Sequence, residues 1–507
     1  MFSLNRRRLL AVLGFLLLAA LLTRIAWTQP TLSDGSNTVL EGWDFAHGDV
    51  LLHGWILSDV SFYVLEIPIA ALSTLAVGAS AAAVHLTAGI VYTLVIGCTL
   101  WCLRSRDVSR TVPALAVLLV PLADVVARHA LITGVDHLGS SVFILLSTLI
   151  VDRLRERWYA AWLLLAVFTL GEVSDGFVTY VGVSAVIGVC VWQMLAEWRL
   201  SWDMPRFIAA ATVSLAAARH VRTELRHLGG YMMTSPNTVV SPRSEWPAHL
   251  RSTWFGLKVL LGFAQTGGGI SGACHLAAGW LLLTLAVLGG IRTLRHWRTR
   301  GSGSEGGSGI PQRIAVLLVP GALVAYMLSE QSAIAGNAFD LAGTLPFCAL
   351  LAANSINGFR GVARVGTKAV AVITALAVVF AVAQPAAATD SSGLISRLRV
   401  LHLGEGISDY PTASSTTVAS GQGVTVRAVV WNGGGFSVYG WETRTQWYRA
   451  AKHEARYFVT SADGSTPKEV ESAFGKPAAA YRIGEYDVLV YSYNLFTRIT
   501  ATTLPTG

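Results

Sequence analysis

Carboxylic acids crowd the segment that follows the first apolar stretch of the chain. A carboxylate near a hydroxyl group can act as a general base, because it takes the proton while the hydroxyl oxygen attacks an electrophile. The segment therefore holds candidates for acid–base chemistry. The alternative is that these acids are ordinary solvated loop residues, made conspicuous because lysine and arginine are rare around them. The acids are Asp34, Glu41, Asp44, Asp49, Asp59 and Glu66.

A second set of polar residues lies at the ends of later apolar stretches. Asp136, His137 and Asp175 carry side chains that can bind a metal ion or sugar hydroxyls. A basic run ends another apolar stretch and offers cations to a phosphate group. The alternative for this run is a juxtamembrane cluster that holds lipid headgroups. The run consists of Arg219, His220, Arg222, Arg226 and His227.

The composition defines the kind of protein that carries these residues. Of the 507 residues, 53% are hydrophobic and 13% are charged, against roughly 25% charged in an average soluble domain. That scarcity of charge excludes a water-soluble globular protein and a disordered one. The five cysteines lie in apolar stretches, so no disulfide framework is expected. No P-loop, dinucleotide-binding, zinc-protease or serine-hydrolase motif occurs in the sequence.

Apolar stretches long enough to cross a membrane recur along most of the chain. A spanning helix needs about 20 mostly apolar residues, and we predict about eleven such helices. The first follows three arginines and is interpreted as an uncleaved anchor. The predicted spans are residues 9–27, 83–103, 113–131, 138–152, 159–171, 177–196, 204–220, 271–292, 313–329, 340–356 and 369–388.

The distribution of charge orients these spans. Arginine is concentrated in alternate loops, and loops rich in lysine and arginine stay in the cytoplasm. The N-terminus is therefore predicted to be cytoplasmic, and the acids are predicted to lie on the outer face of the plasma membrane. The net charge of +8 follows from this topology, so no nucleic-acid partner is expected.

Hydropathy divides the chain into a membrane domain and a smaller C-terminal domain. We predict an all-α polytopic membrane domain over residues 1–388 and an extracytoplasmic α/β domain over residues 389–507. The membrane domain includes a first outer loop at 28–82 and a large outer loop at 221–270. Aromatic and apolar residues within 43–55 predict a helix that lies on the membrane interface.

Local signals place secondary structure in the C-terminal domain. Residues 424–430 and 457–460 have the composition of strands. The sequence Thr-Pro-Lys-Glu at 466–469 is a capping box with proline at the first helical position, and it predicts a helix through Phe474. Residues 481–493 predict a hairpin. The domain is therefore expected to mix helices and strands.

These features together resemble the GT-C superfamily of polytopic glycosyltransferases, which take sugars from polyprenyl-phosphate donors. The resemblance rests on an acid shortly after the first span, Asp44, and on the Glu66-Ile67-Pro68 segment before a helix. It rests also on the large outer loop and on the outer C-terminal domain. Five short stretches are similar to actinobacterial membrane proteins described as glycosyltransferases, namely Gly48–Trp55, Val173–Gly176, Thr344–Phe347, Trp441–Tyr448 and Tyr486–Val490.

The resemblance implies a GT-C-like fold and a reaction. Asp44 would be the catalytic base, or its metal-binding equivalent, and would activate an acceptor hydroxyl for attack on the anomeric carbon with inversion. The partners would be a polyprenyl-phosphate-linked sugar, a cell-envelope glycan or other acceptor, and membrane lipids. No cofactor is assigned, and a divalent metal stays open. The residues implied in substrate binding are Asp49, Glu66, Asp136, His137, Asp175, Arg222 and Arg226.

Two other functions stay open at this point. A transporter or flippase of lipid-linked or envelope substrates would also be polytopic, although such folds often contain internal repeats and none is evident in this sequence. A non-catalytic membrane protein would have the same composition, and its outer acids would be replaceable without a biochemical effect.

Overall fold

The chain forms two compact units in the computed structural model. The helical unit comprises residues 1–28, 88–222 and 237–385, and the mixed unit comprises residues 29–87, 223–236 and 386–507. The mixed unit thus joins most of the first outer loop to the C-terminal domain. The structure describes residues 6–103, 107–133, 137–197, 203–234, 240–264, 269–299, 309–333, 337–355, 360–387, 391–462 and 464–500.

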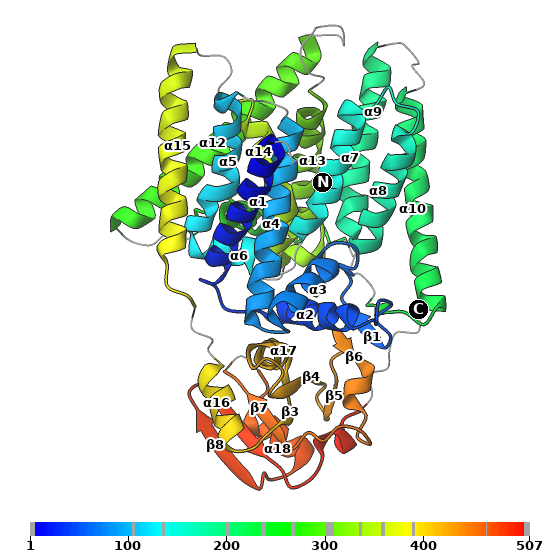
Figure 1. Cartoon of the computed structure of the whole chain (residues 1–507), viewed down its shortest axis with the longest axis vertical. Helices are drawn as coiled ribbons and strands as arrows, with labels where there is room; N and C mark the ends of the chain where they lie inside the picture. Colours follow the sequence, from blue (N-terminus) through cyan, green and yellow to red (C-terminus); the bar gives the residue numbers. More distant parts are fainter. Residues whose placement is uncertain are drawn as a thin grey trace. The chain divides into compact units, whose positions relative to one another are not determined.

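The helical unit is built from helices throughout its described parts (Figure 1). Helix α7 packs against α8, and α13 packs against both α9 and α14. The unit contains the greater part of α4 (Ala81–Leu103) and of α10 (Asp203–His227). Its other helical elements are α1 (Arg6–Ala26), α5 (Val108–Leu119), η1 (Val120–Ala123), α6 (Val125–Ile132), α7 (His137–Arg153), α8 (Ala160–Ser174), η2 (Val178–Val183), α9 (Ser184–Glu197), α11 (Trp246–Leu260), α12 (Gly269–Thr299), α13 (Ile310–Leu328), η3 (Glu330–Ala333), η4 (Asn337–Thr344), α14 (Leu345–Ala352) and α15 (Arg360–Ala383).

Six helices within the described ranges are long and apolar enough to cross a membrane. A seventh span results if the bent pair Val108–Ala123 and Val125–Ile132 counts as one. This set is consistent with a membrane protein. The six are Leu9–Ala26, Ala81–Leu103, Val178–Leu195, Gly269–Trp297, Ile310–Leu328 and Val365–Ala383.

The predicted count of eleven spans is not confirmed. The remaining predicted segments are helical, but they differ from simple spans in length or composition. Helices α7 and α8 have 17 and 15 residues, and α14 has 8, all below the roughly 20 that cross a bilayer. Helix α10 is long enough, but its apolar run is confined to the residues between Arg206 and Arg219.

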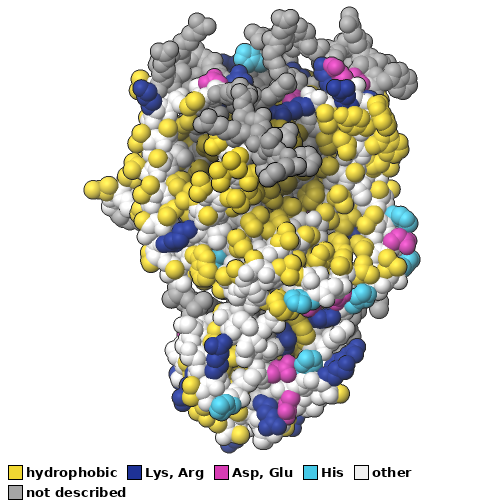
Figure 2. All heavy atoms as spheres, viewed as in Figure 1, with side chains coloured by type: hydrophobic (Ala, Val, Ile, Leu, Met, Phe, Trp, Pro, Cys, Tyr) yellow, Lys and Arg dark blue, Asp and Glu magenta, His cyan; other side chains and the backbone are white. Residues whose placement is uncertain are grey.

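Apolar side chains gather on the surface of the helical unit (Figure 2). Leu17 of α1 is 71% exposed, and Leu376 and Val379 of α15 are each 65% exposed. Large contiguous apolar surfaces are rare on soluble monomers. The faces of α1 and α15 that carry these residues are therefore suited to contact with lipid.

The predicted span at 113–131 is broken by a bend of 108°. The break lies at Asp124, whose Oδ1 accepts hydrogen bonds from the backbone N–H groups of Val126 and Ala127 and so caps α6. Pro121 precedes it in η1 and lacks the N–H group that a continuous helix requires. The sequence therefore ends one helix and starts another within the predicted span.

The mixed unit contains a six-stranded sheet in the order β5–β4–β3–β7–β9–β8. β3 is parallel to β4 and β7, and the other pairs are antiparallel. Two clusters of buried apolar residues pack around this sheet. The elements are β3 (Glu405–Asp409), β4 (Thr425–Trp431), β5 (Phe436–Val438), β7 (Tyr457–Thr460), β8 (Ala479–Ile483) and β9 (Tyr486–Val490), with α16 (Ser392–Val400), η5 (Thr445–Tyr448), α17 (Tyr410–Ala419), α18 (Pro467–Phe474) and η6 (Leu495–Arg498).

Most local predictions for the C-terminal domain are confirmed. The predicted strand at 457–460 is β7, and the hairpin is β8 and β9. The capping box is present, since the Thr466 side chain accepts from the Glu469 backbone N–H and Glu469 accepts from that of Thr466. Short-range signals therefore determined these elements.

A second sheet in the mixed unit joins three distant segments of the chain. β1 (Trp55–Leu57) pairs in parallel with β2 (Met232–Met233) and antiparallel with β6 (Thr443–Arg444). The interfacial helix predicted over 43–55 is wrong in its second half. Helix α2 (Ser33–Ala46) ends before Gly48, which has a φ of +99°, and the chain then turns into β1.

Helix α2 packs against α3 (Glu66–Val77) and α17. Gly42 lets the α2 and α3 backbones approach closely, since a Cβ at this position would lie 2.7 Å from the backbone nitrogen of Ala71. The segment predicted as the first outer loop therefore forms two helices, α2 and α3, and α2 is held between neighbours within the mixed unit.

Candidate active site

The guanidinium group of Arg444 joins the two acids at the end of α2. Its Nη1 lies 2.7 Å from Asp44 Oδ2, and its Nη2 lies 3.0 Å from Asp49 Oδ2. The three side chains are each about one-fifth exposed. A planar guanidinium group can donate to two carboxylates at once, so it fixes the distance between Asp44 and Asp49.

The two oxygens of Asp44 differ in their surroundings. Oδ2 also accepts a hydrogen bond of 2.8 Å from Trp55 Nε1. Oδ1 has no hydrogen-bond partner among the described residues, and it is not one of the fully buried polar atoms. Asp44 is therefore anchored through one oxygen and can accept a proton on the other.

In contrast to Asp44, Asp49 has partners on both of its carboxylate oxygens. Its Oδ1 lies 2.6 Å from His53 Nδ1 and accepts from the His53 backbone N–H, while its Oδ2 is bound by Arg444. Neither oxygen of Asp49 is left open. The structure therefore distinguishes Asp44 as the available base and Asp49 as an anchor for Arg444.

The register of a short sheet brings these groups together. Trp55 in β1 lies directly opposite Arg444 in β6, and residues opposite one another in an antiparallel pair point to the same face. Leu52, with a φ of +53°, and Gly54, with a φ of +76°, make the turns that bring the chain from α2 into β1. Trp55 and Arg444 can then both reach Asp44.

Burial and charge act in opposite directions on Asp44. Burial raises the pKa of its carboxyl above the ordinary value, and Asp49 adds to this effect. The hydrogen bond from Trp55 and the charge of Arg444 lower the pKa. A raised pKa strengthens a carboxylate as a proton acceptor.

Aromatic rings and a second cation extend the cluster. Trp447 packs edge-to-face on Trp55 with ring centroids 4.9 Å apart, and the guanidinium carbon of Arg427 lies 3.8 Å from the centre of the Trp447 ring. Burial lowers the pKa of Arg427 to about 10, which leaves it cationic near neutral pH. The Nε atoms of Arg427 and Arg444 have no hydrogen-bond partner among the described residues.

A polar stripe continues from Asp44 along α2. Asp34, Asn37 and Glu41 precede Asp44 by successive turns of the helix and so lie on the same face. Glu41 is 2% exposed, and its Oε1 has no hydrogen-bond partner among the described residues. Burial, with the nearby charges of Asp44 and Asp34, raises the pKa of Glu41 to about 8.

The helical unit holds a separate polar group that includes two predicted site residues. His137 Nδ1 lies 2.6 Å from Asp175 Oδ2, which also accepts from the Ser140 hydroxyl. Asp175 Oδ1 accepts a bond of 2.7 Å from the Phe177 backbone N–H. The His137 ring stacks on that of Phe177, and its Nε2 lies 3.8 Å from Asp340 Oδ1. The structure thus brings His137 and Asp175 together.

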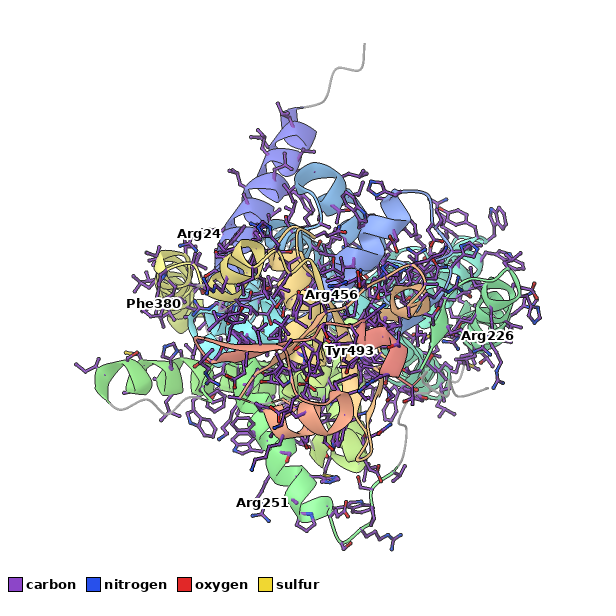
Figure 3. The ribbon with its side chains drawn as sticks, turned by 90° about the horizontal axis from the view of Figure 1, so that it is seen from below. Arg24, Arg226, Arg251, Phe380, Arg456 and Tyr493 are labelled. Carbon is purple, nitrogen blue, oxygen red and sulfur yellow. The ribbon has the colours of Figure 1, made fainter. Side chains whose placement is uncertain are left out.

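The other predicted site residues occupy varied positions. Arg222 Nη1 donates to the backbone oxygen of Glu172, which is a structural contact within the helical unit. Arg226 is exposed in the last turn of α10 and points outward (Figure 3). Glu66 is 1% exposed at the start of α3. Asp136 lies outside the described residues.

Metal binding receives no support from the described part of the chain. No group of three or more His, Cys, Asp or Glu side chains there is arranged to hold a metal ion. At Asp44 and Asp49, Arg444 occupies one oxygen of each carboxylate.

Sequence reasoning did not identify Arg444, Trp55, Arg427 or Glu442 as parts of the site. In the sequence, Trp441, Glu442 and Trp447 stand out only as members of the stretch Trp441–Tyr448. A useful signal was the Trp-Glu-Thr-Arg sequence at 441–444, in which charged residues interrupt an aromatic stretch.

Comparisons of the chain with protein-family models, with curated proteins and with solved structures found no match.

Proposed function

We propose that the chain is a membrane glycosyltransferase that moves a sugar from a polyprenyl-phosphate donor to a cell-envelope acceptor, with Asp44 as the catalytic base. The observation that carries the proposal is the asymmetry of Asp44. One carboxylate oxygen is fixed by Arg444 and Trp55, while the other has no hydrogen-bond partner among the described residues. A base must be held in place and still be open to the proton that it takes.

The proposed reaction is a single displacement. The acceptor hydroxyl oxygen forms a bond to the anomeric carbon of the donor sugar, and its proton passes to Asp44 Oδ1. The bond between the anomeric carbon and the phosphate oxygen breaks, and its electron pair leaves with the polyprenyl phosphate. Attack from the face opposite the leaving group inverts the anomeric centre.

Arg444 and Trp55 are positioning residues in this scheme. They contact Asp44 and direct its free oxygen, because both donate to Oδ2. The positive charge of Arg444 also favours the ionised form of Asp44, because it lowers the pKa that burial raises. Without that charge the carboxyl would hold its proton to higher pH and act less often as a base.

Two features support a membrane-bound substrate and an outer-face site. Six helices in the described part of the chain are apolar enough to span a membrane, and arginine is concentrated in alternate loops of the predicted topology. In this proposal, Glu66 contributes to substrate binding within the mixed unit, and the cation Arg226 attracts the donor phosphate. The extracytoplasmic place of the C-terminal domain and the GT-C-like arrangement of helices belong to the same proposal.

A transporter of lipid-linked substrates is the second candidate, and the broken helix favours it. Asp124 and Arg128, on either side of the start of α6, are 2% and 4% exposed, and atoms of both lack hydrogen-bond partners among the described residues. Helix breaks with buried charges often mark substrate paths in transporters. This observation does not account for the anchoring of Asp44.

Proteoliposomes distinguish the two functions. A vesicle that contains the purified chain, a labelled polyprenyl-phospho-sugar and an envelope glycan acceptor should yield covalently labelled acceptor. Movement of the labelled donor across the bilayer without any covalent product would favour the transporter and reject the transferase.

A further inference from the structure

The hydroxyl group of Tyr410 bridges two buried acids in the mixed unit. Tyr410 stands at the start of α17, and its hydroxyl oxygen is in hydrogen-bond contact with Asp34 Oδ1 of α2 and lies 2.6 Å from Glu442 Oε2. Glu442 is 5% exposed. The three oxygens form a chain of two short contacts.

These two contacts need two hydrogens. A tyrosine hydroxyl has one hydrogen to donate, and an ionised carboxylate has none. Asn37 Nδ2 lies 3.3 Å from both the Tyr410 hydroxyl and Glu442 Oε2, but it does not stand between either pair of close oxygens. The second hydrogen must therefore be carried by Asp34 or Glu442 as a carboxylic acid.

We propose that Asp34, Tyr410 and Glu442 share one proton near neutral pH, and that this proton fastens the Glu442–Arg444 segment to α2. The group is called the proton triad below. Its members come from α2, from the start of α17 and from the residue before β6, so that the shared proton joins three separate segments of the mixed unit.

The charges around the proton triad favour retention of the proton. From α2 it faces Glu41 and, farther along, Asp44; from the C-terminal segments it faces Tyr439. Helix α17 contributes no titratable side chain besides Tyr410, and α3, which packs on α2, contributes only Glu66. The cations Arg427 and Arg444 act on Asp44. The surroundings are therefore mainly acidic, which disfavours a second negative charge.

Burial of Asp34 and Glu442 also favours retention of the proton. It raises the pKa of Glu442 well above the ordinary value, and the charges of Asp34 and Glu41 raise it further. Burial also raises the pKa of Asp34, although the hydrogen bond from Tyr410 opposes this. One of the two acids can then stay protonated where an exposed carboxyl is ionised.

The backbone at Glu442 is strained, which indicates that the contacts of the proton triad hold it in a conformation that it would not otherwise adopt. Glu442 has a φ of +46°, which residues other than glycine rarely adopt. Such a conformation persists only when surrounding contacts impose it. Arg444 follows two residues later, so release of Glu442 would also loosen the guanidinium group from Asp44 and Asp49.

Infrared difference spectroscopy can detect the proton directly in the full-length protein in detergent. A buried carboxylic acid has a C=O stretch that a carboxylate lacks. Since Glu41 is also expected to be protonated, the measurement is made on the Glu41→Gln variant. One acid band should remain near neutral pH and disappear as the pH rises.

Two further substitutions test whether the proton is shared. Adding Asp34→Asn or Glu442→Gln removes one negative charge and supplies an amide donor to Tyr410. In each variant the remaining acid should ionise at lower pH than in the Glu41→Gln parent. The exposed Glu454→Gln change should have no effect on the band. Absence of an acid band in the parent, or a response to only one of the two substitutions, would overturn the shared proton.

Trypsin tests the fastening. The bond after Arg444 should be cleaved several-fold faster, relative to the bond after the exposed Lys452, when the pH rises from about 7 to 9 and the proton triad ionises. Asp34→Asn and Glu442→Gln should abolish that rise, because each supplies the missing hydrogen at all pH values. Equal cleavage of the wild-type protein at both pH values would overturn the fastening.

Neither measurement depends on sugar transfer. The inference bears on the proposed function only through Arg444, which positions Asp44. If the protein shows the acid band and the pH-dependent cleavage after Arg444 but transfers no sugar, the transferase is rejected and the proton triad is retained.

Discussion

Arg444 Nη1 lies 2.7 Å from Asp44 Oδ2, although the two residues are 400 positions apart in the sequence. The contact joins the end of α2 to β6 within one compact unit. It fixes the carboxylate of Asp44, in the last turn of α2, and leaves one oxygen open.

Replacement of Arg444 should misplace the catalytic base and shift its titration. Arg444→Gln removes the charge that lowers the pKa of Asp44, so the acidic limb of the pH–rate profile should move to higher pH. The transfer rate near neutral pH should fall by roughly 10²-fold, as expected when a catalytic group is misplaced. Compared with Arg444→Gln, Arg444→Lys should return the acidic limb part of the way to its wild-type pH but recover less of the transfer rate. The reason is that an ammonium group cannot bridge both acids as a guanidinium group does.

The matched control is Arg482→Gln, which breaks an Arg–Asp pair of 2.6 Å at the β8–β9 hairpin. That variant should keep the wild-type pH–rate profile. An unchanged profile for Arg444→Gln itself would mean that Arg444 does not act on Asp44 in the reaction.

The indole N–H of Trp55 should matter separately from its ring. Trp55→Phe keeps most of the packing against Trp447 but removes the donor to Asp44 Oδ2. A hydrogen bond to a charged group contributes roughly 1.5–3 kcal/mol, so the transfer rate should fall by about 10-fold or more. Trp158→Phe, at a tryptophan that is 77% exposed, is the control. A rate for Trp55→Phe equal to that of the control would contradict the anchoring role.

Glu41 should make the protein less stable as the pH rises. Its pKa is about 8 in the folded chain against an ordinary value of 4.5, so the folded state holds the proton longer than the unfolded state. The stabilisation is complete below about pH 4.5 and is lost as the pH rises to about 8. The wild-type unfolding temperature should therefore decline across this interval.

Glu41→Gln should flatten that decline and make the variant more stable than the wild type at pH 8. The difference should be on the order of 5 kcal/mol, from about 1.4 kcal/mol per pKa unit over the shift from 4.5 to about 8. Thermal unfolding of the full-length protein in detergent measures it. Parallel declines in the two proteins would show that Glu41 is not the group responsible.

Asp175 should contribute more to stability than Asp340, its neighbour across His137. Asp175 has a fully buried side chain and accepts from Ser140, Phe177 and His137, whereas the Asp340 side chain is 32% exposed and lies 3.8 Å from His137. Asp175→Ala should lower the free energy of unfolding by about 3 kcal/mol, as for a broken buried ion pair. Asp340→Ala should change it by less than about 1 kcal/mol. Similar shifts in unfolding temperature for the two variants would contradict this difference.

Local features of the fold could be predicted from the sequence because their causes are local. The capping box at Thr466 and Glu469 and the hairpin of β8 and β9 depend on neighbouring residues. Every segment predicted as a span contains helix over most of its described residues. The count of eleven spans was not confirmed because hydropathy alone does not measure where a helix bends or ends, as at Asp124.

The candidate site was predicted only in part, because its contacts join distant segments. The acids of the first outer loop could be recognised from their clustering in the sequence. Their partners Arg444 and Glu442 could not, since the pairing of β1 with β6 has no local signal in two- and three-residue strands. The distinction between Asp44 and Asp49 likewise depends on which oxygen each uses, and only the three-dimensional structure supplies it.

The most direct test of the central claim is the rate of sugar transfer by Asp44→Asn in reconstituted vesicles. The change keeps the shape of the side chain but removes its basicity, and Asp487→Asn at the Arg482 pair serves as the control. The account predicts a loss of at least about 10²-fold in transfer for Asp44→Asn, the lower end of a general base's contribution, with a normal protein level and an unaffected control. Transfer by Asp44→Asn at the wild-type rate would contradict the assignment of Asp44 as the catalytic base.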